Sequence, residues 1–137
     1  MAIKIYVDQG HNPEAPNGGA EGNGLREQDI TYRVGEELAT LLRADGDYEV
    51  RLSRPTPTSA LGTSNSTSLR ARVEDANAWG ADYFISIHTN ASVNPDATGS
   101  EDFVYAAPSA AFSLGEDIVE NISRITGLRN RGTKVRP

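Results

Sequence analysis

The sequence predicts an α/β fold in which a mostly parallel or mixed sheet is flanked by helices. Short runs rich in β-branched and apolar residues alternate with longer amphipathic segments, which is the pattern of strands joined by helical crossovers. Residues 12–24 and 54–67 are rich in Gly, Pro, Ser, Thr and Asn and are expected to be long loops. The chain has 137 residues, enough for one domain with a core of its own, so we expect residues 1–137 to form a single domain.

Four segments are expected to form strands. Residues 2–8 and 82–88 are short apolar runs typical of buried parallel strands. Residues 48–52 alternate Tyr, Val and Leu with charged residues, which suggests a strand nearer the sheet edge. Residues 101–106 form the fourth candidate, and at residues 135–137 a further strand is expected to begin as the chain stops.

Three amphipathic segments predict helices. The first covers about residues 25–44 and stops at Gly46, because glycine readily takes the left-handed conformation that ends a helix. The second is expected to be capped at residues 66–68 and to end near Gly80, and the third is expected to start after Pro108 and run to Gly127. The residues expected to face the core at helical spacing are Ile30, Val34, Leu38, Leu41, Leu42, Leu69, Val73, Ala76, Leu114, Ile118, Ile122 and Ile125.

Composition and charge disfavour several classes of function. The formal net charge is −6 and the pI is near 4.8, which disfavours a nucleic-acid partner because phosphate binding needs a basic face. No stretch approaches the roughly 18 apolar residues of a membrane span. Residues 1–4 lead directly into a strand, so we expect no signal peptide in this chain. The absence of cysteine excludes disulfides and thiolate metal ligands.

The chain has only two histidines, and each follows a predicted buried strand. His11 ends the first apolar run and His88 ends the later one, so both are expected at the carboxyl edge of the sheet, where ligands bind in parallel α/β folds. Glu27 lies at the expected start of the first helix, close to the same edge. Two imidazoles and a carboxylate form a three-ligand set that leaves zinc a fourth position for water. From spacing alone, the alternative stays open that the histidines are structural and Glu27 is a solvated helix-start charge.

Neighbouring residues are expected to support this site. Gly10 would permit a tight turn out of the first strand before His11. Strand alternation places Ser86, His88 and Asn90 on the same side of the strand. Asp8 or Asn90 could also hydrogen-bond the second nitrogen of an imidazole and fix its tautomer.

Seven short sequence blocks, spread over the whole chain, carry a resemblance to a known family. They are residues 6–11, 24–27, 50–54, 69–72 together with 76–77, 84–91, 99–101 and 130–132. In these blocks and their order the chain resembles the zinc-dependent N-acetylmuramoyl-L-alanine amidases of the amidase type 3 family. The resemblance implies a catalytic domain with a phosphorylase/hydrolase-like α/β fold.

The resemblance also implies the chemistry of the site. The family's ligands correspond to His11, Glu27 and His88, which would hold one Zn²⁺ per chain. The expected reaction is hydrolysis of the amide between N-acetylmuramic acid and the L-alanine of the peptidoglycan stem peptide, with Asn90 at the substrate. The expected location is extracellular or in the cell wall, with delivery by a separate wall-binding module or a protein partner.

The sequence departs from the family pattern at its C-terminal end. The family's general-base glutamate lies on a late strand beyond the block at residues 130–132, and the chain stops at Pro137. We therefore expect a domain truncated at its C-terminus, with the last strand or strands missing and turnover slower than in a longer form. Glu101 is a weak substitute for the base, and Glu14 and Glu21 are weaker still. The alternatives are a non-catalytic module that holds zinc and binds peptidoglycan, and a zinc peptidase of similar fold.

Overall fold

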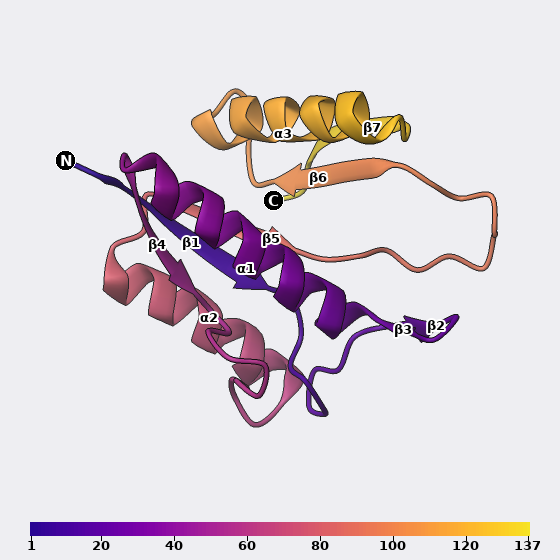
Figure 1. Ribbon diagram of the computed structural model, residues 1–137, viewed down its shortest axis with the longest axis horizontal. Coiled ribbons are helices and arrows are strands. Elements are labelled where there is room, and N and C mark those ends of the chain that lie inside the picture. Colours follow the sequence, from indigo (N-terminus) through magenta and orange to yellow (C-terminus); the bar gives the residue numbers. More distant parts are fainter. The chain divides into compact units, whose positions relative to one another are not determined.

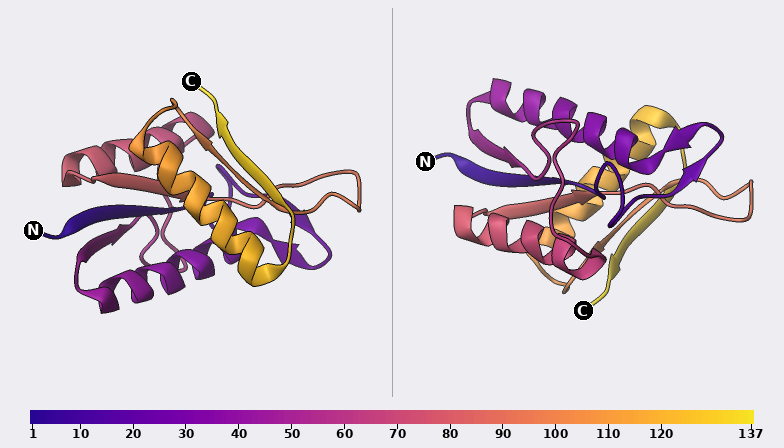
Figure 2. Two further views of the ribbon diagram at one scale, coloured as in Figure 1. Left: turned by 90° about the horizontal axis from the view of Figure 1, so that it is seen from above. Right: turned by 90° about the horizontal axis from the view of Figure 1, so that it is seen from below.

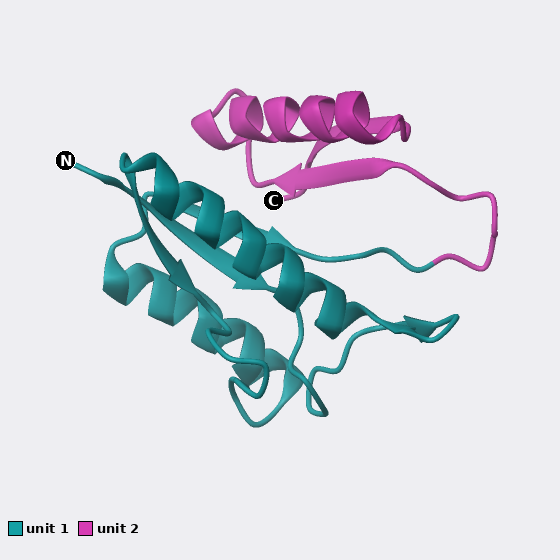
Figure 3. Cartoon of the chain, viewed as in Figure 1, with its two compact units in different colours: residues 1–91 teal, residues 92–137 magenta.

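The computed structural model describes residues 1–137 and shows the expected mixed α/β architecture. The chain divides into two compact units, residues 1–91 and residues 92–137 (Figure 3). Each unit has strands and at least one helix of its own. That residues 1–137 act as one domain stays a prediction.

The first unit is built on a three-stranded parallel sheet. Its strands are β1 (Ile3–Gln9), β4 (Tyr48–Leu52) and β5 (Tyr83–Ile87), in the order β4-β1-β5 (Figure 1). The central strand β1 is buried over its last five residues because it has a neighbour on both sides. Both pairings are parallel, so all three carboxyl ends lie at one edge of the sheet, as the sequence predicts.

Two helices cover opposite faces of this sheet (Figure 2). Helix α1 (Glu27–Asp45) lies on the face to which the Gln9 side chain points, and that side chain packs close to Gly35. Helix α2 (Asn65–Trp79) lies on the other face, where the Tyr6 hydroxyl donates a hydrogen bond to Asp75. A short antiparallel hairpin leads into α1: β2 (Glu21–Gly22) lies in the expected loop, whereas β3 (Leu25–Arg26) takes the two positions where the helix was expected to begin.

The buried faces of both helices differ from the apolar stripes expected from the sequence. Val34 and Leu41 of α1 are exposed, and α1 buries Thr31, Gly35 and Ala39 instead. On α2, Leu69 and Val73 are about half exposed, and the buried residues are Ser68, Arg72 and Ala76. The reason is that the sheet presents polar groups such as Gln9 and Asp8 to these helices, so small and hydrogen-bonding side chains occupy the contact.

Helix α2 begins slightly earlier than predicted. Ser64, not the segment 66–68, is the N-cap, and it forms a capping box with Thr67: each side chain accepts a hydrogen bond from the other residue's backbone N–H. The helix ends at Gly80 in the left-handed conformation, as predicted, and α1 ends in the same way at Gly46.

The second unit pairs two parallel strands through one helical crossover. Strand β6 (Ser100–Val104) is followed by α3 (Ala110–Thr126) and β7 (Asn130–Val135). The last strand therefore begins at Asn130 and not at residue 135, where the sequence suggested a start. Gly115 of α3 lies against the Asp102 carboxylate, where any larger residue would collide with it.

Helix α3 buries a narrower face than the sequence predicts. Gly115 and Val119 are buried, whereas Ile125, expected to face inward, is 74% exposed. Ile122 is also partly exposed. None of the three helices has the length and apolar character needed to cross a bilayer.

Candidate metal centre

The two histidines leave neighbouring strands at the same edge of the first sheet. Hydrogen bonding continues past β1, where the Gly10 N–H donates to the Ile87 carbonyl at 3.0 Å. A Cβ on Gly10 would lie 2.5 Å from that carbonyl and 2.5 Å from the His88 ring. Glycine is therefore required here by the close approach of His88. The tight turn proposed from the sequence falls on the next residue, because His11 has a φ of 70°.

Glu27 is the first residue of α1 and its side chain is only 6% exposed. Its two carboxylate oxygens accept hydrogen bonds from the backbone N–H groups of Ala20, at 3.1 Å, and Thr89, at 2.8 Å. Burial works against ionisation of this carboxyl, but the hydrogen bonds from the two N–H groups favour it, and the pKa of Glu27 lies below its usual range. The site therefore contains a buried carboxylate held in its charged form.

The three side chains converge on one point. His11 Nε2 lies 3.2 Å from one Glu27 oxygen, and His88 Nδ1 lies 3.5 Å from the other. The two ring nitrogens are 3.3 Å apart, and the rings meet nearly at right angles, at 87°. Ligand atoms around one tetrahedral zinc ion, about 2.0–2.1 Å from the metal, stand roughly 3.3–3.4 Å apart. The donor set and its spacing fit a zinc ion, and the structure brings together the three residues proposed from the sequence.

The other nitrogen of each ring is also hydrogen-bonded. His11 Nδ1 lies 3.1 Å from the Asn17 side-chain oxygen, and His88 Nε2 lies 3.1 Å from the Ser86 hydroxyl. The sequence suggested Asp8 or Asn90 for this role. Asp8 contributes one step further away, because the Ser86 hydroxyl donates to its carboxylate at 2.7 Å.

Sequence reasoning missed Asn17 and Ser86 as partners of the two histidines. Ser86 could have been found, since it precedes His88 by two positions and a strand places both on one side. Asn17 lies in a loop whose path no periodic signal fixes. Its φ of 65° is a conformation that asparagine tolerates better than most residues.

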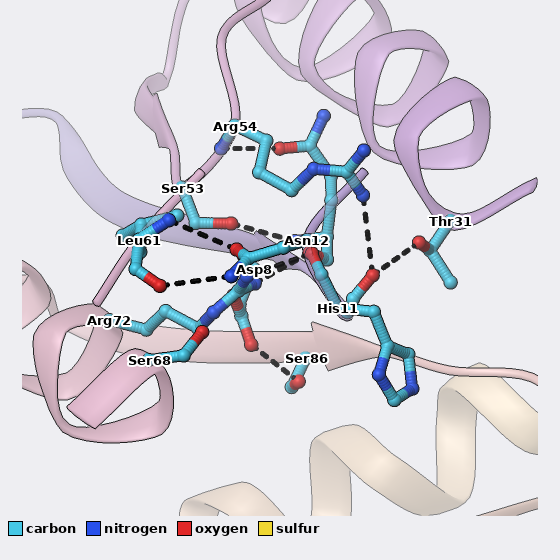
Figure 4. A network of polar contacts seen from close by, with 12 residues as sticks. Asp8, His11, Asn12, Thr31, Ser53, Arg54, Leu61, Ser68, Arg72 and Ser86 are labelled. Atoms are coloured by element: carbon cyan, nitrogen blue, oxygen red, sulfur yellow. Dashed lines mark hydrogen bonds and ion pairs between the residues drawn. The ribbon is translucent and has the colours of Figure 1, made fainter. Parts of the chain in front are cut away.

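A buried polar network beneath the site holds the backbone that carries His11 (Figure 4). Its centre is Arg72 of α2, which is 1% exposed. The Arg72 guanidinium forms an ion pair with Asp8 at 2.8 Å. It also donates to the Gln9 carbonyl at 2.6 Å, the His11 carbonyl at 2.8 Å and the Asn12 side chain at 3.0 Å. One side chain on another element thus fixes four acceptors that lie between residues 8 and 12.

A second arginine supports the same turn from the side of α1. The buried Arg54 guanidinium donates to the carbonyls of Gly10, at 3.3 Å, and Gln28, at 2.9 Å. The Thr31 hydroxyl donates to the same Gly10 carbonyl at 2.7 Å. Asn12 joins the turn to the next loop through hydrogen bonds with the backbone N–H and carbonyl of Leu61, both 3.0 Å long. The backbone that carries His11 is therefore held by side chains from both helices.

The remaining sequence candidates occupy different surroundings. Asn90 lies two residues after His88 in an exposed segment of the first unit. Glu14 and Glu21 both pair with Arg26, each at 2.9 Å. Sharing one guanidinium favours a role in ordering the loop for these two carboxylates.

Glu101 belongs to the second unit. It is the second residue of β6, and its carboxylate forms ion pairs with two residues of β7, Lys134 and Arg131. These ion pairs link the side chains of the two paired strands, β6 and β7. They favour a structural role for Glu101.

Comparisons with known proteins give one consistent result. The family model described as N-acetylmuramoyl-L-alanine amidase matches residues 5–137. The amidase CwlM of Bacillus licheniformis is 38% identical over 135 residues, covering 96% of this chain and 48% of that protein. A sporulation-specific N-acetylmuramoyl-L-alanine amidase of Bacillus subtilis is 33% identical over 138 residues, with the same coverage. The chain thus spans about half the length of these curated relatives.

A solved structure shares the fold. The crystal structure of an N-acetylmuramoyl-L-alanine amidase from Clostridium difficile 630 superimposes with a TM-score of 0.82 and 28% sequence identity. The match covers 98% of this chain and 70% of that one. The α/β fold predicted from the sequence is therefore the fold of amidase catalytic domains.

Proposed function

Because this chain belongs to the N-acetylmuramoyl-L-alanine amidase family, we propose that it hydrolyses the amide between N-acetylmuramic acid and the L-alanine of the peptidoglycan stem peptide. One zinc ion would be held by His11, Glu27 and His88. The observation that carries the proposal is the convergence of three donor atoms at separations of 3.2 to 3.5 Å. Zinc supplies a Lewis acid that polarises an amide carbonyl and lowers the pKa of water to about 7.

The chain's own residues would prepare the site for this chemistry. Glu27 brings one negative charge against two neutral imidazoles, so a divalent ion would keep a net positive charge at the reacting carbonyl. The N–H groups of Ala20 and Thr89 hold the Glu27 carboxylate in place. Asn90, exposed beside His88, is proposed to bind the substrate through its amide.

The proton acceptor of the reaction is not assigned to a residue. In the first unit Asp8, Glu14 and Glu21 are all ion-paired, Asp8 with Arg72 and the two glutamates with Arg26. These ion pairs favour structural roles for all three carboxylates.

Zinc content and muropeptide digestion, measured together, test the proposal. We expect one zinc per chain and release of free stem peptide, and loss of both in His88→Ala. Tyr83→Phe, which alters the same strand without touching the ligands, is the control and should retain both. Absence of zinc from the unaltered chain would overturn the proposal.

The same experiment separates the two alternatives. A module that only holds zinc and binds peptidoglycan would show zinc and muropeptide affinity without any product. A zinc peptidase would cleave simple peptides that lack muramic acid at a comparable rate. We propose the cell wall as the place of action, and delivery there by a wall-binding module or protein partner, because a Bacillus anthracis relative named as a cell wall amidase matches this chain.

A further inference from the structure

The partner of His11 fixes which of its ring nitrogens carries the proton. The Asn17 side-chain N–H donates to the Ser68 hydroxyl at 3.0 Å, so the amide oxygen of Asn17 is the atom that faces His11 Nδ1. An amide oxygen only accepts hydrogen bonds, and therefore Nδ1 of His11 must carry the proton. Nε2, the nitrogen beside Glu27, is then left with its lone pair. Free histidine prefers the opposite tautomer, so Asn17 selects the less common one.

The partner of His88 has the equivalent effect on the other nitrogen. The Ser86 hydroxyl donates its only proton to the Asp8 carboxylate, which forms an ion pair with Arg72. The Ser86 oxygen can therefore only accept from His88 Nε2. Nε2 carries the proton, and Nδ1, the nitrogen that faces His11 and Glu27, has the free lone pair.

Both series of hydrogen bonds end on the same helix, α2. The first, the Asn17 relay, runs from His11 through Asn17 to Ser68. The second, the Ser86 relay, runs from His88 through Ser86 and Asp8 to Arg72. Ser68 and Arg72 are four residues apart on α2, hence one turn apart on one face, and both are fully buried there.

We propose, on the basis of the metal site proposed above, that α2 presets the tautomers of both ligands through these two relays. His11 is assigned to bind through Nε2 and His88 through Nδ1, with Asn17 and Ser86 as positioning residues. The consequence is that two nitrogen lone pairs and a carboxylate face one another across 3.2 to 3.5 Å with no proton between them. A cation would relieve the repulsion among these three groups. The site is therefore arranged for metal binding before the metal arrives.

A matched pair of variants tests the Asn17 relay. Asn17→Gly removes the side chain at a position whose φ of 65° glycine accepts, whereas Asn17→Asp keeps an oxygen that can accept from His11. With metal removed and in mildly alkaline buffer, ring-nitrogen NMR should show the Nδ1-protonated form of His11 in the unaltered chain and in Asn17→Asp. In Asn17→Gly it should show mainly the Nε2-protonated form. Zinc affinity should fall about 10- to 100-fold in Asn17→Gly only.

A second pair of variants tests the Ser86 relay, and a single variant at Ser68 tests the point where the Asn17 relay reaches α2. Ser86→Ala should lower zinc affinity about tenfold, and Ser86→Thr, which keeps the hydroxyl, should restore most of it. Ser68→Ala should leave His11 divided between both tautomers, because Asn17 then loses the contact that orients its amide. Only two histidines are present, so each ring signal can be assigned from single variants.

The outcomes separate this inference from the proposed activity. If Asn17→Gly and Ser86→Ala fold normally by circular dichroism and bind zinc as tightly as the unaltered chain, the relays do not position the ligands and the inference is overturned. The same holds if ring-nitrogen NMR finds His11 protonated on Nε2 in the unaltered metal-free chain. Expected tautomers and affinities without release of stem peptide would overturn the amidase proposal alone.

Discussion

At the scale of single residues, close approach decides which amino acids the site accepts. Gly10 and Gly19 both lie where a Cβ would collide with residues of the candidate metal centre. A Cβ on Gly10 would collide with the Ile87 carbonyl and the His88 ring, and one on Gly19 would lie 2.8 Å from the Cβ of Glu27. The candidate metal ligands are thus packed against backbone, and their separations depend on the absence of side chains there.

We expect Gly10→Ala to destabilise the first unit and to displace His88. The added methyl meets a backbone carbonyl that cannot move without breaking the β1–β5 pairing, so the free energy of unfolding should fall by about 1–3 kcal/mol. Zinc affinity should fall as well. Gly18→Ala is the matched control, because a Cβ there has no neighbour within 4 Å, and it should change stability by less than about 0.5 kcal/mol. Urea unfolding of both variants measures the difference; equal midpoints would contradict the expectation.

At the scale of elements, α2 shows why apolar periodicity misplaced two of the three residues expected to face the core, whereas Ala76 is buried as predicted. Leu69 and Val73 have helical spacing, but the face that meets the sheet carries Ser68 and Arg72. Those two side chains complete hydrogen bonds to groups on other segments, and a pattern within one helix contains no information about them. The bounds of α2 depend on local capping and were predicted to within a few residues, whereas its buried face depends on Asp8 and was predicted only at Ala76.

The contact between α2 and the sheet should make stability depend on pH. The Asp75 carboxylate accepts two hydrogen bonds from the Arg51 guanidinium, at 2.9 and 3.0 Å, and one from the Tyr6 hydroxyl, at 2.8 Å. The Arg51 hydrogen bonds outweigh partial burial and hold the pKa of Asp75 below its usual range. Because the pKa is lower in the folded chain than in the unfolded one, this stabilisation is complete above the unfolded value and is lost as pH falls through the folded value.

We therefore expect Asp75→Asn to lower the free energy of unfolding by about 1 kcal/mol at neutral pH. The difference from the unaltered chain should shrink as pH falls below about 4, where the native carboxyl also becomes protonated. Urea unfolding over a pH series measures this. Glu74→Gln, an exposed change on the same helix, should show little effect at any pH, and a constant difference for Asp75→Asn would argue against the ion pair as its cause.

At the scale of the whole molecule, the features predicted correctly from the sequence are those that depend on rare residues and on where strands end. Two histidines after two predicted strands, with a glutamate at a helix start, were enough to place the candidate ligands, although β5, expected to be buried, is partly exposed. Strand alternation places Ser86 beside His88, but the hydrogen bond of Ser86 to Asp8 depends on the strand register, and the position of Asn17 depends on the path of a loop. The division into two units was not predicted either, because both halves carry similar strand and helix patterns.

All three candidate ligands lie in the first unit, so metal binding should protect the two units unequally. An ion that binds only the folded site stabilises it by about 2.7 kcal/mol at a concentration one hundred times its dissociation constant. We expect zinc to slow amide hydrogen exchange in β1, β5 and the start of α1, and to leave exchange in residues 92–137 unchanged. Mass spectrometry of exchanged peptides with and without zinc measures this, and His88→Ala should abolish the protection. Equal slowing in both units would show that metal binding is coupled to the second unit as well, against the assignment of a self-contained site to residues 1–91.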